Sequence, residues 1–242
     1  MIKLVCLVSR QWSLNILKKL EINQNLSIQG VFFDESSILK KSKLFKLKSK
    51  NINPYNLILY ENNIKDLKPD IILAYGWSYF IPNQIREICK VLVLHPSNLP
   101  KYRGGSPIQN QILDGINTTD VCIFIANKKI DSGPIIYREK LSLKGYLNEI
   151  FKRITTIGVR GTLKIIDDLK KGQLIKSYQN EKLATYKKRR KPSMSEIVLN
   201  DFVKFDAEYI YNKVRSLQKP YPRVFIKCKN NTKIYLDKVS LD

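Results

Sequence analysis

Histidine and cysteine are scarce in this sequence, and their scarcity excludes several kinds of site. The 242 residues include one histidine and four cysteines. Cys6, Cys89, Cys122 and Cys228 lie far apart, without the CxxC or similar spacing of a metal site. We therefore expect reduced cysteines, three of them within apolar runs, and no bound metal.

Long apolar segments are also missing. No run approaches the ~20 apolar residues of a membrane-spanning helix, and the N-terminal MIKLVCLVSRQW has no small-residue cleavage site. We therefore expect a cytoplasmic protein that does not insert into a membrane.

Acidic residues are in short supply. The sequence has 43 Lys and Arg against 21 Asp and Glu, which gives a net charge of +22. Such an excess suits a polyanionic partner such as nucleic acid, a membrane surface or a phosphorylated substrate. The lysines, however, are spread along the chain among Ile and Asn, with local clusters only at 41–50 and 186–192. Because no nucleic-acid-binding module accompanies them, we expect no nucleic-acid partner.

Apolar residues make up 43% of the chain, enough for the core of a domain, and they follow two alternating patterns. Short β-branched runs predict strands at 2–8, 27–34, 56–60, 70–76, 91–95 and 121–127. Apolar residues at three- and four-residue steps predict helices at 9–22, 81–90, 106–115 and 146–172, the first capped by Ser9. Strands that alternate with helices indicate an α/β fold with an open, mostly parallel sheet.

The last quarter of the chain has a different character. A basic, irregular stretch is followed by a short helix at 207–217 and by two alternating segments, RVFIKC and KIYLDKV, which predict a β-hairpin. We expect a main domain over 1–180 and a C-terminal extension, with its helix and hairpin, over 181–242. Because an isolated hairpin is marginal in water, the extension is expected to form a homodimer interface.

The single histidine stands at the start of an irregular loop, HPSNLPKYRGGSP. His95 ends the strand at 91–95, and ligands of open α/β sheets bind beyond the carboxyl ends of the strands. Asp131, in IDSGPIIY, follows the strand at 121–127, so its carboxylate can lie at the same edge and orient the imidazole. The alternative is that both residues are purely structural, with the histidine hydrogen-bonded to local backbone and the aspartate only forming a turn.

Three segments, DIILAYGWSYFIP, HPSNLPKYRGGSP and IDSGPII, resemble the formyltransferases that use N10-formyltetrahydrofolate. That family has a pattern close to NxHxSLLPxYRGxxP followed by DxGxII, and the resemblance covers roughly residues 65 to 145. It implies a Rossmann-like formyltransferase domain, direct transfer of a formyl group to an amine, catalysis by His95 and Asp131, and no metal. It also implies a folate slot along 75–82, formed by Tyr75, Trp77, Tyr79, Phe80 and Ile81; core packing is the alternative for these aromatic side chains.

One residue of the family pattern is missing. The family's asparagine lies two residues before the histidine and is expected to donate a hydrogen bond to the formyl oxygen, but here that position is Val93. We expect Asn98, in the following loop, to supply the missing amide. A backbone amide, protonated His95, or loss of activity are the alternatives.

The ending of the chain is most similar to that of enzymes that formylate nucleotide-linked amino sugars, commonly dTDP-4-amino-4,6-dideoxyglucose, for surface polysaccharide such as O-antigen. Basic and loop residues near the site are expected to bind this acceptor: Ser9, Arg10, Lys101, Tyr102, Arg103 and Gly104. The alternatives are a methionyl-tRNA or glycinamide ribonucleotide formyltransferase, a binding protein that has lost turnover, and a basic RNA-associated protein. We expect no C-terminal barrel of the kind that methionyl-tRNA formyltransferases carry.

Overall fold

A seven-stranded sheet forms the centre of the molecule. The computed structural model describes residues 1–34 and 49–242. In these residues the strand order is β3-β2-β1-β4-β5-β7-β8, parallel from β3 to β5 and antiparallel from β5 to β8. The strands are β1 (Ile2–Val8), β2 (Leu26–Asp34), β3 (Ser49–Ile52), β4 (Ile71–Tyr75), β5 (Lys90–His95), β7 (Thr118–Ile125) and β8 (Ile135–Ser142). The predicted open, mostly parallel sheet is confirmed.

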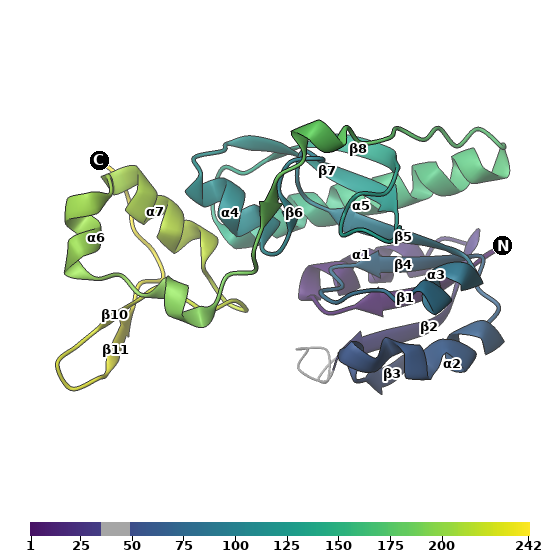
Figure 1. Cartoon of the computed structure of the whole chain (residues 1–242), viewed down its shortest axis with the longest axis horizontal. Helices are drawn as coiled ribbons and strands as arrows, with labels where there is room; N and C mark the ends of the chain where they lie inside the picture. Colours follow the sequence, from purple (N-terminus) through teal and green to yellow (C-terminus); the bar gives the residue numbers. More distant parts are fainter. Residues whose placement is uncertain (35–48) are drawn as a thin grey trace.

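Helices cover both faces of the sheet (Figure 1). On one face α1 (Gln11–Glu21) and α5 (Leu147–Lys170) pack on the odd-numbered residues of β4, such as Leu73. On the other face η2 (Pro54–Tyr60), α2 (Glu61–Asp66) and α3 (Asn83–Ile88) pack on the even-numbered residues, such as Ile72. Because side chains alternate along a strand, this division decides which residues can reach a site on either face.

Close packing of α5 depends on two glycines. A Cβ added at Gly158 would lie 2.5 Å from Cδ1 of Ile16 on α1, and one at Gly161 would lie 2.6 Å from Cδ1 of Tyr137 on β8. Both distances are shorter than side-chain atoms tolerate, so these glycines let the longest helix approach α1 and the sheet. The helix was predicted at 146–172 and is observed over most of that range.

The prediction of a strand at 56–60 was wrong. These residues belong to η2, which begins with Pro54 after Asn53, whose side chain accepts a hydrogen bond from the main-chain N–H of Tyr55. A short apolar run does not distinguish strand from helix, and the Asn-Pro pair is a helix-start signal that outweighs it. The expected lysine cluster at 41–50 lies almost entirely outside the described residues.

The C-terminal part lies at the end of the sheet domain where α4 (Pro107–Leu113) is found, and α7 (Ala207–Ser216) packs on α4 (Figure 1). The predicted hairpin is present in a shorter form, β10 (Phe225–Lys227) and β11 (Lys233–Tyr235). After α5 the chain forms η3 (Glu181–Leu183) and β9 (Tyr186–Lys187), which pairs with β6 (Arg103–Gly104) of the histidine loop. It continues through η4 (Pro192–Ser195) and α6 (Leu199–Lys204) to α7. Within the described residues, no helix combines the length and apolarity needed to cross a membrane.

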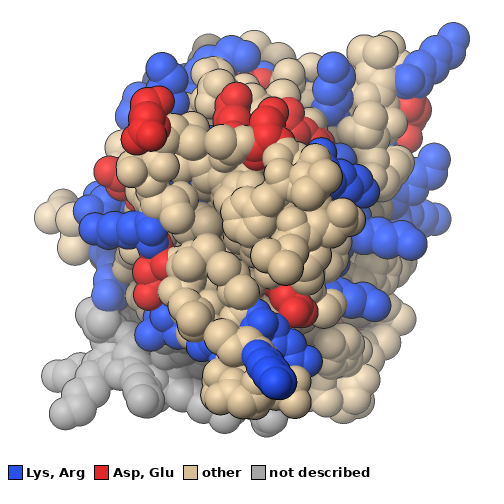
Figure 2. All heavy atoms as spheres, turned by 90° about the vertical axis from the view of Figure 1, so that its left-hand side faces the viewer, with Lys and Arg blue, Asp and Glu red and all other residues tan. Residues whose placement is uncertain are grey.

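The helix α6 was not predicted, and it carries exposed apolar side chains. Leu199 is 88% exposed, Val203 87% and Phe202 55%. Figure 2 views this side of the molecule and shows a broad surface without charged side chains, bordered by acidic and basic groups. The hairpin, by contrast, turns part of its apolar face inward, where Ile226 packs against a buried cluster that includes Val214 of α7.

Candidate active site

Alternation along β5 places Val93 and His95 on one face of the sheet. Val93 packs beside Phe124 of β7, and His95 pairs in register with Cys122 of the same strand. Leu92 and Leu94 face the opposite side, toward the core that α1 and α5 cover. The position of the family's missing asparagine and the only histidine therefore face the same space at the carboxyl end of β5.

The structure brings His95 and Asp131 together. The imidazole Nδ1 lies 3.5 Å from Oδ2 of Asp131, and both side chains are largely buried. Nε2 lies 2.8 Å from the main-chain carbonyl oxygen of Tyr102. A carbonyl oxygen only accepts, so Nε2 carries a hydrogen, and Nδ1 is the nitrogen free to exchange a proton with Asp131.

Backbone geometry fixes the carboxylate of Asp131. The residue has a left-handed φ of 50°, which is uncommon without glycine, and Oδ2 accepts a hydrogen bond of 2.8 Å from the main-chain N–H of Gly104. Gly133 lies so close to β7 that an added Cβ would be 1.7 Å from the carbonyl oxygen of Ile125. Glycine at position 133 is thus required by the close passage of this loop along the strand.

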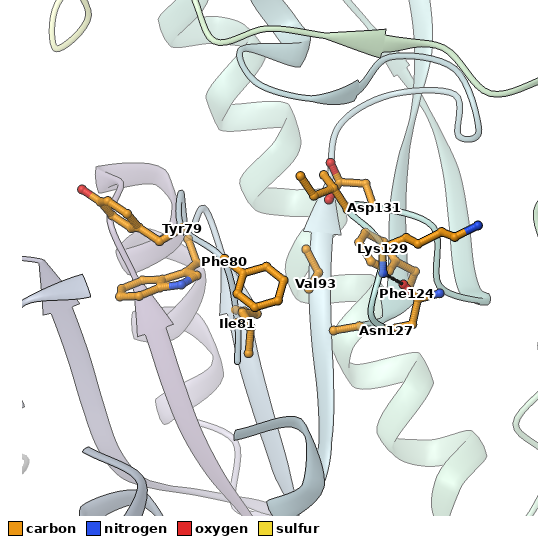
Figure 3. A pocket seen from close by; sticks show the side chains of 12 residues that line it. Tyr79, Phe80, Ile81, Val93, Phe124, Asn127, Lys129 and Asp131 are labelled. Carbon is orange, nitrogen blue, oxygen red and sulfur yellow. Dashed lines mark hydrogen bonds between the residues drawn. The ribbon is translucent and has the colours of Figure 1, made fainter. Parts of the chain in front are cut away.

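A pocket of about 100 Å³ opens beside this pair (Figure 3). Trp77, Tyr79, Phe80 and Ile81, which were expected in a folate slot, all line it. The other lining residues come from the strands and from the loop that carries Asp131: Ala74, Val93, Phe124, Ala126, Asn127, Lys129, Ile130 and Asp131. The Asp131 loop follows β7 directly, so its position at this edge could have been predicted, although Asn127, Lys129 and Ile130 were not named.

Tyr75 was wrongly expected in the folate slot. Its side chain is fully buried on the α5 side of the sheet, and its hydroxyl is 2.9 Å from Oγ1 of Thr162. Burial raises the pKa of Tyr75 above its ordinary range. Because Ala74 faces the pocket, its neighbour in the strand has to face the other way.

The walls of the pocket suit a flat heteroaromatic ring. They are mostly apolar and aromatic, and the indole nitrogen of Trp77 is buried without a hydrogen-bond partner among the described residues. A buried donor without a partner is costly, so this nitrogen is an unusual feature next to the pocket. These features fit the pterin ring of a folate, which Trp77, Tyr79 and Phe80 would hold.

Asn98 lies away from the pocket, contrary to expectation. It is not among the described residues that line the pocket, and its Oδ1 accepts a hydrogen bond of 2.6 Å from Arg138 of β8. Its main-chain N–H donates to Thr119 of β7. These contacts direct Asn98 toward the antiparallel strands, so the side chain that was expected to replace the missing amide is engaged elsewhere.

Arg103 was expected to bind substrate, but its side chain is completely buried. It donates to Gln179, Glu181 and Tyr186, which all belong to the segment 179–186. The hydrogen bond from Arg103 holds the pKa of the Glu181 carboxyl below its ordinary value. Arg103 therefore joins the histidine loop to a later segment and has no free donor for a ligand.

The neighbours of Arg103 also have internal contacts. The hydroxyl of Tyr102 donates to Asp114, and desolvation together with this carboxylate raises the pKa of Tyr102 to about 12. Gly104 contributes its N–H to Asp131, and a Cβ at Gly104 would lie 2.6 Å from the carbonyl oxygen of Lys187. Lys101 is exposed. Tyr102, through its carbonyl oxygen, and Gly104, through its N–H, therefore contact His95 and Asp131 directly.

Two arginines from distant segments meet at Ser78, the residue after Trp77. Arg10 donates from Nη2 to the Ser78 hydroxyl across 3.0 Å, and Arg189 donates to the Ser78 carbonyl oxygen across 2.7 Å. Ser9 does not cap α1 as predicted, because Arg10 is the capping residue and has no side-chain cap. The Ser9 hydroxyl is buried without a partner among the described residues. Arg189 was not named as a site residue, although it belongs to the basic cluster at 186–192.

Comparison with known proteins agrees with this geometry. A family model described as "Formyl transferase" matches residues 37–151. The methionyl-tRNA formyltransferase of Finegoldia magna is 30% identical over 94% of this chain and 77% of its own length. The chain belongs to the formyltransferase family. Members of this family take the formyl group from N10-formyltetrahydrofolate.

Other members of the family differ in length and acceptor. The methionyl-tRNA formyltransferase of Sulfurihydrogenibium sp. is 31% identical over 72% of this chain, but the chain spans only 56% of that relative. The structure of a methionyl-tRNA formyltransferase from Clostridium thermocellum has 28% identity, a TM-score of 0.71 and 97% coverage of each chain. A 4-N formyltransferase from Francisella tularensis has a TM-score of 0.78 over 97% of this chain and 96% of its own, and its 17% identity makes this a likeness of fold.

Proposed function

We propose that the protein is an N-formyltransferase that moves a formyl group from N10-formyltetrahydrofolate to the amine of a nucleotide-linked amino sugar. The observation that carries the proposal is the His95–Asp131 pair, which is buried beside the aromatic pocket. The donor supplies the formyl group on its N10 atom. The pocket residues hold the ring of the donor, so that its formyl group lies near Asp131 and Val93.

The His95–Asp131 pair handles the proton of the acceptor amine. A primary amine that attacks the formyl carbon has to lose a proton, and folate N10 has to gain one. Asp131 is the member of the pair that lines the pocket, and His95 lies behind it with Nδ1 toward Oδ2. We therefore assign Asp131 as the group that takes the proton from the amine and then gives it to N10, and His95 as the neighbour that can hold this proton on Nδ1 in between.

The choice of a sugar nucleotide rests on the cationic groups near Ser78. Arg10 and Arg189 converge there, and the N-terminal end of α1 lies beside the buried hydroxyl of Ser9. A pyrophosphate suits paired guanidinium groups next to a helix N-terminus. We propose dTDP-4-amino-4,6-dideoxyglucose as the acceptor and a role in surface polysaccharide such as O-antigen, in the cytoplasm.

Methionyl-tRNA is the second candidate acceptor, because the relatives described above with 30% or more identity are named methionyl-tRNA formyltransferases. A third possibility follows from Val93, which cannot donate to the formyl oxygen. A homologue that binds folate and the nucleotide sugar but turns over weakly would have such a substitution.

The experiment is a set of parallel reactions with purified protein and N10-formyltetrahydrofolate. The acceptors are dTDP-4-amino-4,6-dideoxyglucose, methionyl-tRNA and glycinamide ribonucleotide, and mass spectrometry detects the mass of one added formyl group. Formylation of the sugar nucleotide in preference to the other two supports the proposal. Preference for methionyl-tRNA would overturn it, and binding without transfer would identify the weakened homologue.

A further inference from the structure

Gln179 connects the histidine loop to the Asp131 loop, although no sequence motif contains it and the family model ends before it. Its Nε2 donates to the main-chain carbonyl oxygens of Asp131 and Gly133, across 2.9 and 2.8 Å. Its Oε1 accepts from Nε and Nη2 of Arg103, across 3.2 and 2.9 Å. One amide thus holds the chain on both sides of Ser132 and is itself held by the histidine loop.

The orientation of this amide follows from its partners. A guanidinium group can only donate, and carbonyl oxygens can only accept, so the oxygen of Gln179 must face Arg103 and its NH₂ must face the Asp131 loop. All five N–H hydrogens of Arg103 have acceptors, because Glu181 and Tyr186 take those that Gln179 does not. The side chain of Arg103 is also completely buried, so it forms a fixed support for the amide.

The loop that Gln179 holds is conformationally demanding. Asp131 keeps a left-handed φ of 50°, and the two carbonyl groups that Gln179 binds flank the turn through Ser132. In this conformation the carboxylate of Asp131 meets the N–H of Gly104 and Nδ1 of His95. Contacts that surround a strained backbone usually determine whether it persists.

We infer that Gln179 is a positioning residue that sets the carboxylate of Asp131 against His95, and that Arg103 acts through it. The inference rests on the proposed function, since the pair has to carry the proton. According to this inference, the buried Arg103 contributes to catalysis through Gln179, without contact to substrate.

The test compares Gln179→Met, which has similar length and no amide, with Gln179→Glu, which keeps acceptors for Arg103 but cannot donate to the carbonyl groups. Both variants should lower kcat by ~10-fold or more, because a displacement of about 1 Å at the reacting groups costs up to ~100-fold. The KM values for folate and acceptor should change less than about 3-fold, since Gln179 is not among the described residues that line the pocket. Gln173→Met, at an exposed position shortly before, is the matched control and should behave as the unmodified protein.

A second measurement does not depend on turnover. His95 is the only histidine, so its imidazole gives one identifiable set of NMR signals. The chemical shifts of these signals should change in both Gln179 variants and stay the same in Gln173→Met. Melting temperatures are recorded to confirm that each variant is folded. Unmoved imidazole signals in folded Gln179→Met and Gln179→Glu would overturn the inference whether or not any acceptor is formylated. Moved signals without formylation of any acceptor would count against the proposed function alone.

Discussion

The imidazole Nε2 of His95 donates to the main-chain carbonyl oxygen of Tyr102, across 2.8 Å. This contact uses one ring nitrogen for structure and leaves the other, Nδ1, facing Asp131. The roles of the two ring nitrogens can therefore be tested one at a time by substitution. The side-chain amide of asparagine occupies roughly the position of Nδ1, and that of glutamine roughly the position of Nε2.

His95→Asn should fold and lose turnover by at least ~100-fold, the usual cost of a lost acid or base. His95→Gln, which can still donate to Tyr102, should be as inactive and melt at a temperature closer to that of the unmodified protein. Single-turnover formyl transfer and thermal melting measure the two effects. Activity within a few-fold of normal in His95→Asn would end the assignment of this residue.

Asp131→Asn should impair catalysis with little change in folate affinity. The substitution keeps the size of the side chain and can still accept from Gly104, but it removes the negative charge 3.5 Å from His95. Folate binding by fluorescence titration and kcat for formyl transfer are to be measured on the same preparation. A loss of folate affinity with normal kcat would instead identify Asp131 as a ligand-binding turn residue.

A structural feature can be predicted from the sequence when residues close to it along the chain determine it. The strand ending in His95 and the Asp-Ser-Gly loop were predictable, because alternation and glycine requirements act over a few residues. Alternation would also have directed Tyr75 away from the pocket, since Ala74 faces it. That error came from treating the aromatic segment as a unit.

The surroundings of Arg103 were not predictable in the same way. Its partners lie more than seventy residues away along the chain, and pairing of β6 with β9 brings them together. A positive side chain in a glycine-rich loop beside a proposed anion site suggests a contact with a ligand. Only the folded structure reveals that the guanidinium group of Arg103 already donates to Gln179 and Glu181. Asn98 was misassigned for the same reason, because Arg138 reaches it from β8.

Asn98→Ala should be nearly silent in catalysis. Its amide oxygen is bound to Arg138, and it is not among the described residues of the pocket, so no donor to the formyl oxygen is lost. We expect kcat within about 3-fold of normal, well below the ~100-fold cost of an oxyanion donor. Steady-state kinetics on the formylated acceptor provides the measurement, and a 100-fold loss would restore Asn98 as the donor.

Self-association should depend on α6. We propose a homodimer formed by the C-terminal extension, because Leu199 and Val203 of α6 are the most exposed large apolar side chains among the described residues. The side of the molecule that carries α6 is the one viewed in Figure 2. Exposed apolar surface with a charged border is typical of interaction sites. Leu199→Glu should shift the protein toward monomer in light scattering, whereas Ile175→Glu, at a position 82% exposed on the sheet domain, should not. An unchanged oligomeric state in Leu199→Glu would contradict this interface.

The substitution of valine for the family's asparagine gives the remaining prediction. Val93 lines the pocket between the aromatic side chain of Phe80 and the Asp131 loop, and an amide at this position would face the proposed site of the formyl group (Figure 3). Val93→Asn should therefore raise kcat by ~10-fold or more, since a donor that strengthens with developing charge acts on the transition state.

The same change places an amide against apolar neighbours and should lower the free energy of unfolding by ~1 to 3 kcal/mol. Val91→Asn is the matched control, because Val91 lies two residues earlier on the same face of β5 but is buried away from the pocket. It should show the loss of stability in chemical denaturation without a gain in rate. If Val93→Asn is destabilised like the control and kcat does not rise, a main-chain N–H or the protonated pair already stabilises the formyl oxygen, and the valine is compatible with full activity.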